Sequence, residues 1–196
     1  MKRLILFALL LLTTLYTRAQ TPTSLPQIAT RDTVKFSSSY SCRSAEEFYR
    51  NGYEGTALFL TNEMKQRNSP DLVFNGACGS ENYFQSGTHG GNVSLVADLN
   101  KGTIVPQLSS ITSSGGWRDT QALKKLGFKQ KVPVISGHTY AVLLNKHGIL
   151  GLFVFTVVDF VPDRHAVISY EVLDYQITQT MISASRSSPT KKDSRH

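Results

Sequence analysis

Three apolar segments separated by short polar gaps dominate the C-terminal half of the chain. They cover residues 138–145, 150–160 and 166–177 and are rich in β-branched and aromatic side chains. Such segments are typical of β-strands, and gaps this short join strands that run antiparallel to one another. The pattern therefore predicts a three-strand antiparallel meander.

The middle segment is predominantly apolar on both of its faces. Phe153 and Phe155 would lie on one face, and Leu152 and Val154 on the other. A strand with two apolar faces must be covered on both sides, which predicts a central position in its sheet. The third segment alternates apolar and polar residues over 168–172, which favours a place nearer an edge or a solvated face.

The N-terminal half shows weaker patterns. Short apolar runs predict strands at residues 56–60, 71–74, 93–99 and 103–108, the last two joined by a turn at 98–102. Two short helices are predicted at 45–50 and 120–126, the first opened by a capping box from Ser44 to Glu47. Together these elements predict a mainly β domain, an antiparallel sandwich or flattened barrel with a C-terminal three-strand meander and two short helices. The sandwich is favoured.

The ends of the chain differ in composition from its middle. Two basic residues, an uninterrupted apolar run and small residues before Gln20 have the form of a secretory signal. The apolar run is shorter than the roughly 20 residues that span a membrane, so we expect no membrane span. The predicted divisions are a signal peptide at 1–19, an extended lead-in at 20–35, a single β domain at 36–182 and a disordered basic tail at 183–196. We expect a secreted protein, extracellular or periplasmic.

The formal net charge of +7 would suit an anionic partner. Much of this charge, however, lies in the signal segment and in the serine-rich tail, which leaves the domain between them close to neutral. One local basic group, 118–131, is interpreted as a solvated surface. The sequence therefore favours no nucleic-acid partner, and it indicates no particular oligomeric state.

Only two cysteines occur, Cys42 and Cys78. An even number of cysteines in an exported chain favours a disulfide, because the compartment is oxidising. The predicted bond would tie the first helix to a glycine-rich stretch that begins at Asn75.

The alternative is that Cys78 acts as a nucleophile in a small exported hydrolase. A histidine would then serve as its base, with Asp159 or Asp174 orienting the imidazole. The candidate bases are His89, His138 and His165. A third possibility is a structural component of the cell envelope.

Metal ligands and cofactor motifs do not stand out in the sequence. The histidines show none of the spacings that place two ligands on one face, and Asp98-x-Asn100-x-Gly102 lacks the later positions of a calcium loop. No phosphate-binding glycine loop follows a predicted strand. We therefore expect no metal and no cofactor.

Three aromatic residues lie in or beside glycine- and serine-rich stretches, namely Tyr83, Phe84 and Trp117. Aromatic rings on such loops can stack on sugar rings or anchor a protein partner, although they can also fold back onto the core. These residues are the predicted ligand-binding positions. The sequence as a whole favours a secreted, disulfide-bonded β domain that acts as a binding module, with a glycan or a cell-surface protein as ligand.

Overall fold

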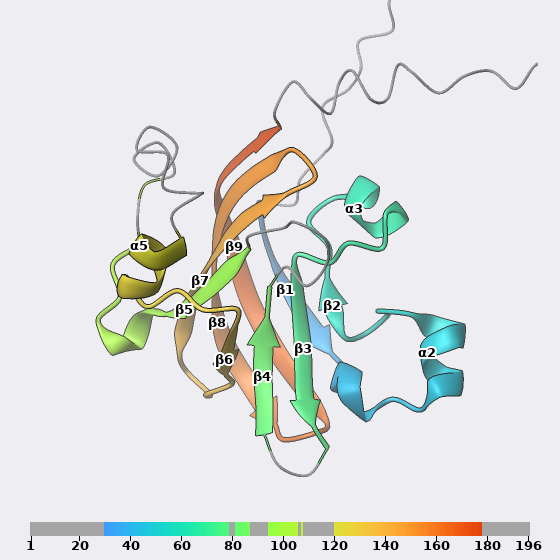
Figure 1. The fold of residues 1–196 in the computed structure, drawn as a ribbon. Helices are drawn as coiled ribbons and strands as arrows, with labels where there is room; N and C mark the ends of the chain where they lie inside the picture. Colours follow the sequence, from blue (N-terminus) through green and yellow to red (C-terminus); the bar gives the residue numbers. More distant parts are fainter. Residues whose placement is uncertain (1–29, 79–80, 87–93, 106, 108–119, 178–196) are drawn as a thin grey trace, which may run out of the picture.

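The computed structural model describes residues 30–78, 81–86, 94–105, 107 and 120–177 (Figure 1). These residues form two antiparallel sheets with a few short helices at their margins. No closed barrel is formed by the described part of the chain. The prediction of a mainly β, sandwich-like domain is confirmed.

The larger sheet has five strands in the order β1-β9-β8-β7-β5. Their bounds are β1 (Arg31–Phe36), β5 (Leu95–Asp98), β7 (Thr139–Lys146), β8 (Ile149–Val161) and β9 (His165–Ile177). The strands β7, β8 and β9 pair in sequence with antiparallel register, so the predicted meander is confirmed. Its middle strand lies at the centre of the sheet, as predicted.

The smaller sheet has four strands in the order β2-β3-β4-β6. Their bounds are β2 (Ala57–Leu58), β3 (Leu72–Ala77), β4 (Glu81–Gln85) and β6 (Lys131–Pro133). The helices are α2 (Ala45–Asn51), α3 (Asn62–Gln66) and α5 (Thr120–Lys125), and single 3₁₀ turns occur at η1 (Tyr40–Cys42) and η2 (Leu99–Lys101). Both predicted helices are present, and the capping box at Ser44 and Glu47 is formed.

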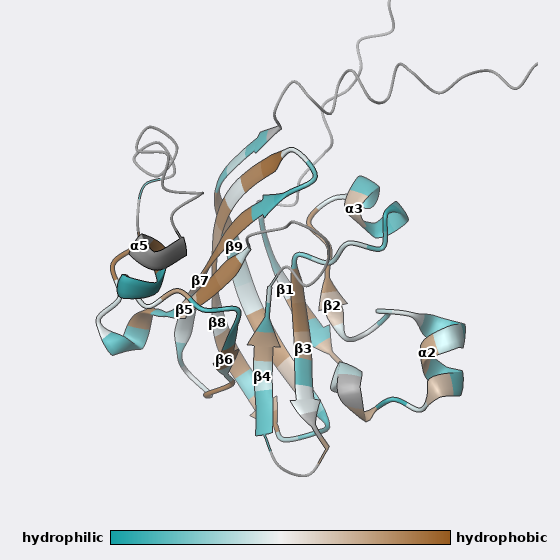
Figure 2. Cartoon of the chain, viewed as in Figure 1, coloured by the Kyte–Doolittle hydropathy of each residue, from teal (hydrophilic) through white to brown (hydrophobic). Residues whose placement is uncertain are grey.

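Aromatic side chains fill the space between the sheets. The ring of Phe84 packs within 4.9 Å of Phe155 and within 6.1 Å of Phe36, centroid to centroid. Tyr140 stacks on Phe155 at 5.0 Å. Apolar residues line the strands of both sheets (brown in Figure 2), which is the expected source of most of the stability of such a core.

The outer face of the larger sheet is covered over part of its width. Leu123 of α5 and the adjacent Phe128 pack on residues of β5, β7 and β8, including Leu143 and Leu152. Both faces of β8 are therefore covered near its middle, where Phe153 and Phe155 are buried on the opposite side. The covering of both faces explains why this strand is apolar without alternation.

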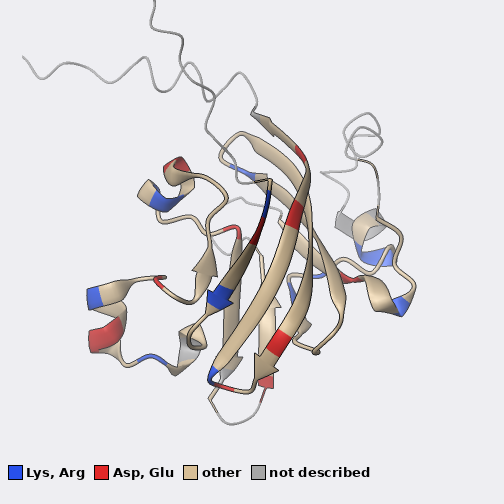
Figure 3. Ribbon diagram, turned by 180° about the vertical axis from the view of Figure 1, so that it is seen from behind, with Lys and Arg blue, Asp and Glu red and all other residues tan. Residues whose placement is uncertain are grey.

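The strands β8 and β9 carry two irregularities in their pairing. The pairing passes from Leu152–Asp174 to Phe153–Val172, so that Leu173 is an extra residue in β9. Val158 is likewise the extra residue in β8. Both side chains are about half exposed, Val158 at 54% and Leu173 at 49%. Seen from behind, the strands of this sheet carry both basic and acidic residues, and neither sign forms a large cluster (Figure 3).

Several elements differ from the sequence-based expectations. All of β1 except Phe36 falls in the predicted lead-in, so the sheet begins at Arg31. β9, in contrast, lies next to the edge strand β1, in agreement with its predicted place nearer an edge than the middle strand. The strands β4 and β6 and the helix α3 were not predicted, and no strand is present at the described residues 103–105 and 107 of the predicted segment 103–108.

Candidate functional site

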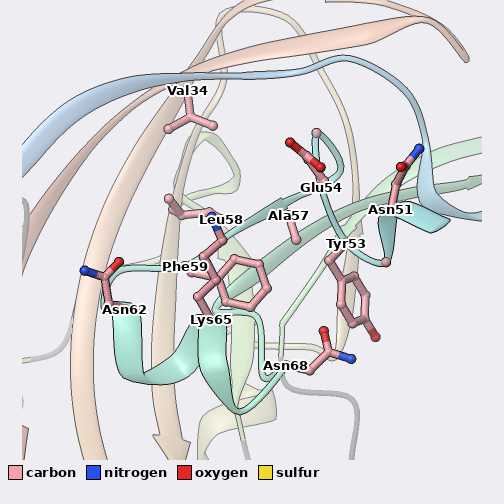
Figure 4. Close-up of a pocket in the computed structure, with 12 residues that line it drawn as sticks. Val34, Asn51, Tyr53, Glu54, Ala57, Leu58, Phe59, Asn62, Lys65 and Asn68 are labelled. Atoms are coloured by element: carbon pink, nitrogen blue, oxygen red, sulfur yellow. The ribbon is translucent and has the colours of Figure 1, made fainter. Parts of the chain in front are cut away.

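A pocket of about 550 Å³ opens on the side of the molecule where β1 and β2 approach each other (Figure 4). Its walls come from the end of α2, the segment that follows it, β2 and α3. The residues that line it are Val34, Asn51, Gly52, Tyr53, Glu54, Gly55, Ala57, Leu58, Phe59, Asn62, Lys65 and Asn68. Most of these residues come from one short stretch of the chain, so the pocket depends on how that stretch is folded.

The wall that follows α2 is held by an arginine. The helix ends at Gly52, whose φ of 52° suits glycine. Arg43 donates from Nη1 to the Gly52 carbonyl at 2.9 Å and from Nη2 to the Glu54 carbonyl. The Ser37 N–H donates to the Gly55 carbonyl at 2.7 Å. These bonds join the wall to both η1 and the end of β1.

The opposite wall is formed by α3. Thr61 caps this helix by accepting a hydrogen bond from the Met64 N–H at 3.2 Å. The Met64 side chain is fully buried, so α3 is anchored to the core although it is short. Asn68 ends the turn that follows with a φ of 52°, a left-handed conformation that asparagine tolerates better than most residues.

The pocket has an apolar floor and a polar rim. Tyr53 and Leu58 of the floor are buried, and Phe59 is half-buried. The polar side chains around the pocket are all exposed: Asn51, Glu54, Asn62, Lys65 and Asn68. An apolar floor with a few polar groups at the margin is the usual composition of a small-molecule site.

Aromatic rings support the floor from behind. Tyr53 stacks on Tyr40 of η1 at 4.7 Å and meets Phe59 edge to face at 6.4 Å. Burial raises the pKa of Tyr40 to about 12, with a further contribution from its hydrogen bond with Tyr53. The Tyr40 phenol is therefore protonated at neutral pH and adds no charge beside the site.

The rim is nearly balanced in charge. It contains one carboxylate, Glu54, and one ammonium, Lys65, beside three asparagine amides. Each amide can both donate and accept hydrogen bonds, whereas a phosphate or carboxylate ligand would call for an excess of donors and cations. The site is therefore suited to an uncharged ligand that carries hydroxyl groups and an apolar face.

The predicted disulfide is confirmed. Cys42 and Cys78 are bonded, with their Cα atoms 5.2 Å apart. The bond joins η1, which carries Tyr40, to the end of β3. With its sulfur in this bond, Cys78 has no thiol to act as a nucleophile. A disulfide also points to an oxidising, extracellular type of compartment.

The predicted aromatic positions have different locations. Phe84 is 0% exposed and packs in the core, so it cannot stack on a ligand from solution, which corrects its assignment as a binding residue. Tyr83 is half-buried beside Lys131, whose Nζ lies 4.8 Å from the ring centroid. Trp117 lies outside the described residues. Neither Tyr83 nor Phe84 lines the pocket.

Two of the three histidines considered as bases are paired with aspartates. His165 Nε2 lies 2.7 Å from Asp159 Oδ2, one of the several combinations that the sequence left open. His138 Nδ1 lies 3.1 Å from both carboxylate oxygens of the buried Asp98. His89 lies outside the described residues. The described residues contain no group of three or more potential metal ligands.

The pocket itself was not predicted from the sequence. Its asparagines at 51, 62 and 68 show no periodicity, and they line one pocket only through the folding of the segment from α2 to α3. The one usable signal was the density of aromatic residues between Tyr40 and Phe59, which is high for a stretch of this length and of otherwise polar composition.

No known family model, curated protein or solved structure matches this chain. Among the helices of the described residues, none combines the length and the apolar character needed to cross a membrane.

Proposed function

We propose that the protein is an exported binding protein that takes a neutral carbohydrate in the pocket between β1, β2, α2 and α3. The observation that carries this proposal is the apolar floor beneath a polar rim with balanced charge. The signal-like N-terminus and the disulfide support export to an oxidising compartment.

A sugar ring fits this chemistry because it is amphipathic. Its C–H groups form an apolar face, which suits the floor around Phe59 and Leu58. Its hydroxyl groups both donate and accept hydrogen bonds, as the amides of Asn51 and Asn62 do. The pocket volume of about 550 Å³ lies within the range of small-ligand sites.

The alternative as a hydrolase with Cys78 as nucleophile is not favoured, because the bonded sulfur is not available for attack. The proposed carbohydrate site also differs in location from the binding positions predicted from the sequence, which lie in or beside glycine- and serine-rich stretches. Tyr83 remains partly accessible, but it lies on β4 of the smaller sheet and does not line the pocket.

The proposal is tested by calorimetric titration with glucose, mannose, galactose, N-acetylglucosamine and their oligomers. The double variant Asn51→Ala/Asn62→Ala removes two rim amides that are exposed. Two hydrogen bonds of about 1 kcal/mol each correspond to a loss of affinity of about tenfold or more.

The matched control is Gln130→Ala, which removes an exposed amide outside the pocket. We expect its affinity to equal that of the wild type. Binding of none of these sugars would refute the proposal, and so would equal losses in the double variant and the control.

A further inference from the structure

A continuous series of aromatic rings leads from the pocket to the exposed surface of α2. We call it the aromatic strip and define it as Phe59, Tyr53, Tyr40, Phe48 and Tyr49. Successive ring centroids are 6.4, 4.7, 5.5 and 6.0 Å apart, so each ring contacts the next. The strip links two places that are otherwise separate, the pocket floor and the helix surface.

From Tyr53 onwards, exposure increases along the strip towards α2. Tyr53 in the pocket floor is 8% exposed, Phe48 is 38% exposed and Tyr49 is 86% exposed. No residue of α2 is buried, and the helix projects from the body beside β2 (Figure 1). Tyr49 therefore contributes little to packing in this chain, and its ring is accessible to a ligand.

The charged residues of α2 are engaged with each other or with the helix terminus. Arg50 pairs with Glu46, and the Glu47 carboxylate accepts from the Ser44 N–H at 2.8 Å within the capping box. Two glutamates and one arginine leave the helix with a formal charge of −1, whereas the pocket rim has one charge of each sign. The helix thus presents exposed rings beside a small negative charge in its first turn, which suits an uncharged ligand with apolar faces better than an anionic one.

We infer that the ligand is a carbohydrate chain and that the α2 end of the aromatic strip binds the units that lie outside the pocket. This inference rests on the proposed function. Tyr49 does not line the pocket, so a short sugar bound there leaves this ring in water. A chain that leaves the pocket on the α2 side covers Phe48 and Tyr49 with further sugar faces.

The length of the sugar chain distinguishes binding in the pocket from binding at the α2 end of the aromatic strip. The experiment measures the affinities for the disaccharides and hexasaccharides of glucose, mannose, galactose and N-acetylglucosamine. For the sugar that binds, we expect the hexasaccharide to bind the wild type at least about tenfold more tightly than the disaccharide, because its outer units add contacts without a second association cost.

Tyr49→Ala should abolish this gain with chain length and leave the affinity for the disaccharide unchanged within about twofold. Tyr49→Phe keeps the ring and should keep the gain. Ile104→Ala is the control, since Ile104 is a similarly exposed apolar residue at 78% and lies outside the strip. An unchanged melting temperature confirms that Tyr49→Ala is folded.

The possible outcomes are distinct. Binding of the disaccharide with no dependence on chain length, or with the same dependence in Tyr49→Ala, overturns the inference and leaves the pocket proposal intact. Binding of no sugar removes both. A wild type that self-associates in light scattering, together with a monomeric Tyr49→Ala, identifies the strip as a contact between two copies and also overturns the inference.

Discussion

The C-terminal meander and the pocket side of the molecule keep their shapes by different means. The meander consists of three long strands, with 8, 13 and 13 residues, whose side chains fill the core. The pocket side, residues 37–71, has a two-residue strand and helices of seven and five residues. It depends on Arg43, on two helix caps and on a disulfide.

A buried ion pair connects the two regions. Lys146, the last residue of β7, lies with its Nζ 2.8 Å from Asp71 Oδ1 and donates to the Ser69 carbonyl at 2.6 Å. Burial lowers the pKa of Lys146 and raises the pKa of Asp71, and each partner opposes the shift of the other. This buried contact ties the segment before β3 to the end of β7.

The meander should be the more sensitive region to loss of apolar volume. Phe155→Ala removes a ring that is 1% exposed and contacts Phe84 and Tyr140. We expect the free energy of unfolding to fall by about 3–5 kcal/mol, as in other large-to-small core substitutions. Denaturant unfolding measures this loss, and a change below about 1 kcal/mol would contradict the assignment of the meander as the main source of stability.

The disulfide should matter most on the pocket side. Replacing both cysteines, as Cys42→Ala/Cys78→Ala, opens a cross-link between residues 36 positions apart. We expect a loss of roughly 2–4 kcal/mol, since the unfolded chain gains freedom.

Amide hydrogen exchange locates the effect of this double replacement. The wild type is first brought with denaturant to the same free energy of unfolding as the variant. Under these conditions we expect the amides of η1 and β3 to exchange faster in the variant and those of β7 to β9 to exchange at equal rates. Equal acceleration in both regions would show that the disulfide supports the whole domain.

The smallest expected effect is on the stability at alkaline pH. It compares two tyrosines, one in each region. Burial raises the pKa of Tyr140 to about 12 and contributes most to raising that of Tyr40 to about 12. In the unfolded chain a tyrosine ionises near pH 10, so the folded state retains the proton in the interval between. The stabilisation that each provides is complete below about pH 10 and is lost as the pH rises towards about 12.

We expect Tyr140→Phe to flatten the alkaline decline in the free energy of unfolding, because Tyr140 ionises only with disruption of the core. Tyr40→Phe should leave the global decline nearly unchanged if the pocket side opens locally. Denaturant unfolding across this pH interval measures both. If Tyr40→Phe flattened the alkaline decline more than Tyr140→Phe, the pocket side and not the meander would carry the larger share of the global stability.

The same contrast explains how far the sequence could predict the fold. In the meander, each strand pairs with its neighbour in the chain, and the gap that contains Gly148 is short enough to indicate the hairpin directly. The pattern of residues 150–160 also indicated cover on both faces. Local pairing and a strong apolar pattern make such regions predictable.

The smaller sheet lacks these signals. β4 lies between glycine-rich stretches, and its residues were therefore interpreted as part of a loop. Within Glu81–Gln85, Asn82 and Phe84 are buried and alternate with more exposed neighbours, which is the period of a strand. The alternation was present in the sequence, but a segment of five residues is too short to outweigh the flanking glycines.

The binding pocket was harder still to predict. Three of its five polar rim residues are exposed asparagines, whose sequence pattern resembles that of any turn. Their convergence depends on tertiary contacts such as those of Arg43 with Gly52 and Glu54. The disulfide was predictable, in contrast, because only two cysteines were available to pair.

The pairing of β1 with β9 has a consequence for the order of folding. Arg31 of β1 lies opposite Glu171 of β9, so the contact closes a loop of 140 residues. Contacts of such high sequence separation form slowly, because the loss of chain entropy precedes the gain in contacts. The hairpins of the meander form from near neighbours, and β1 can dock only on a β9 that is already in place. Until then the edge of β9 has unpaired backbone groups, and a folding intermediate with this free edge is the species most prone to join another chain by strand pairing.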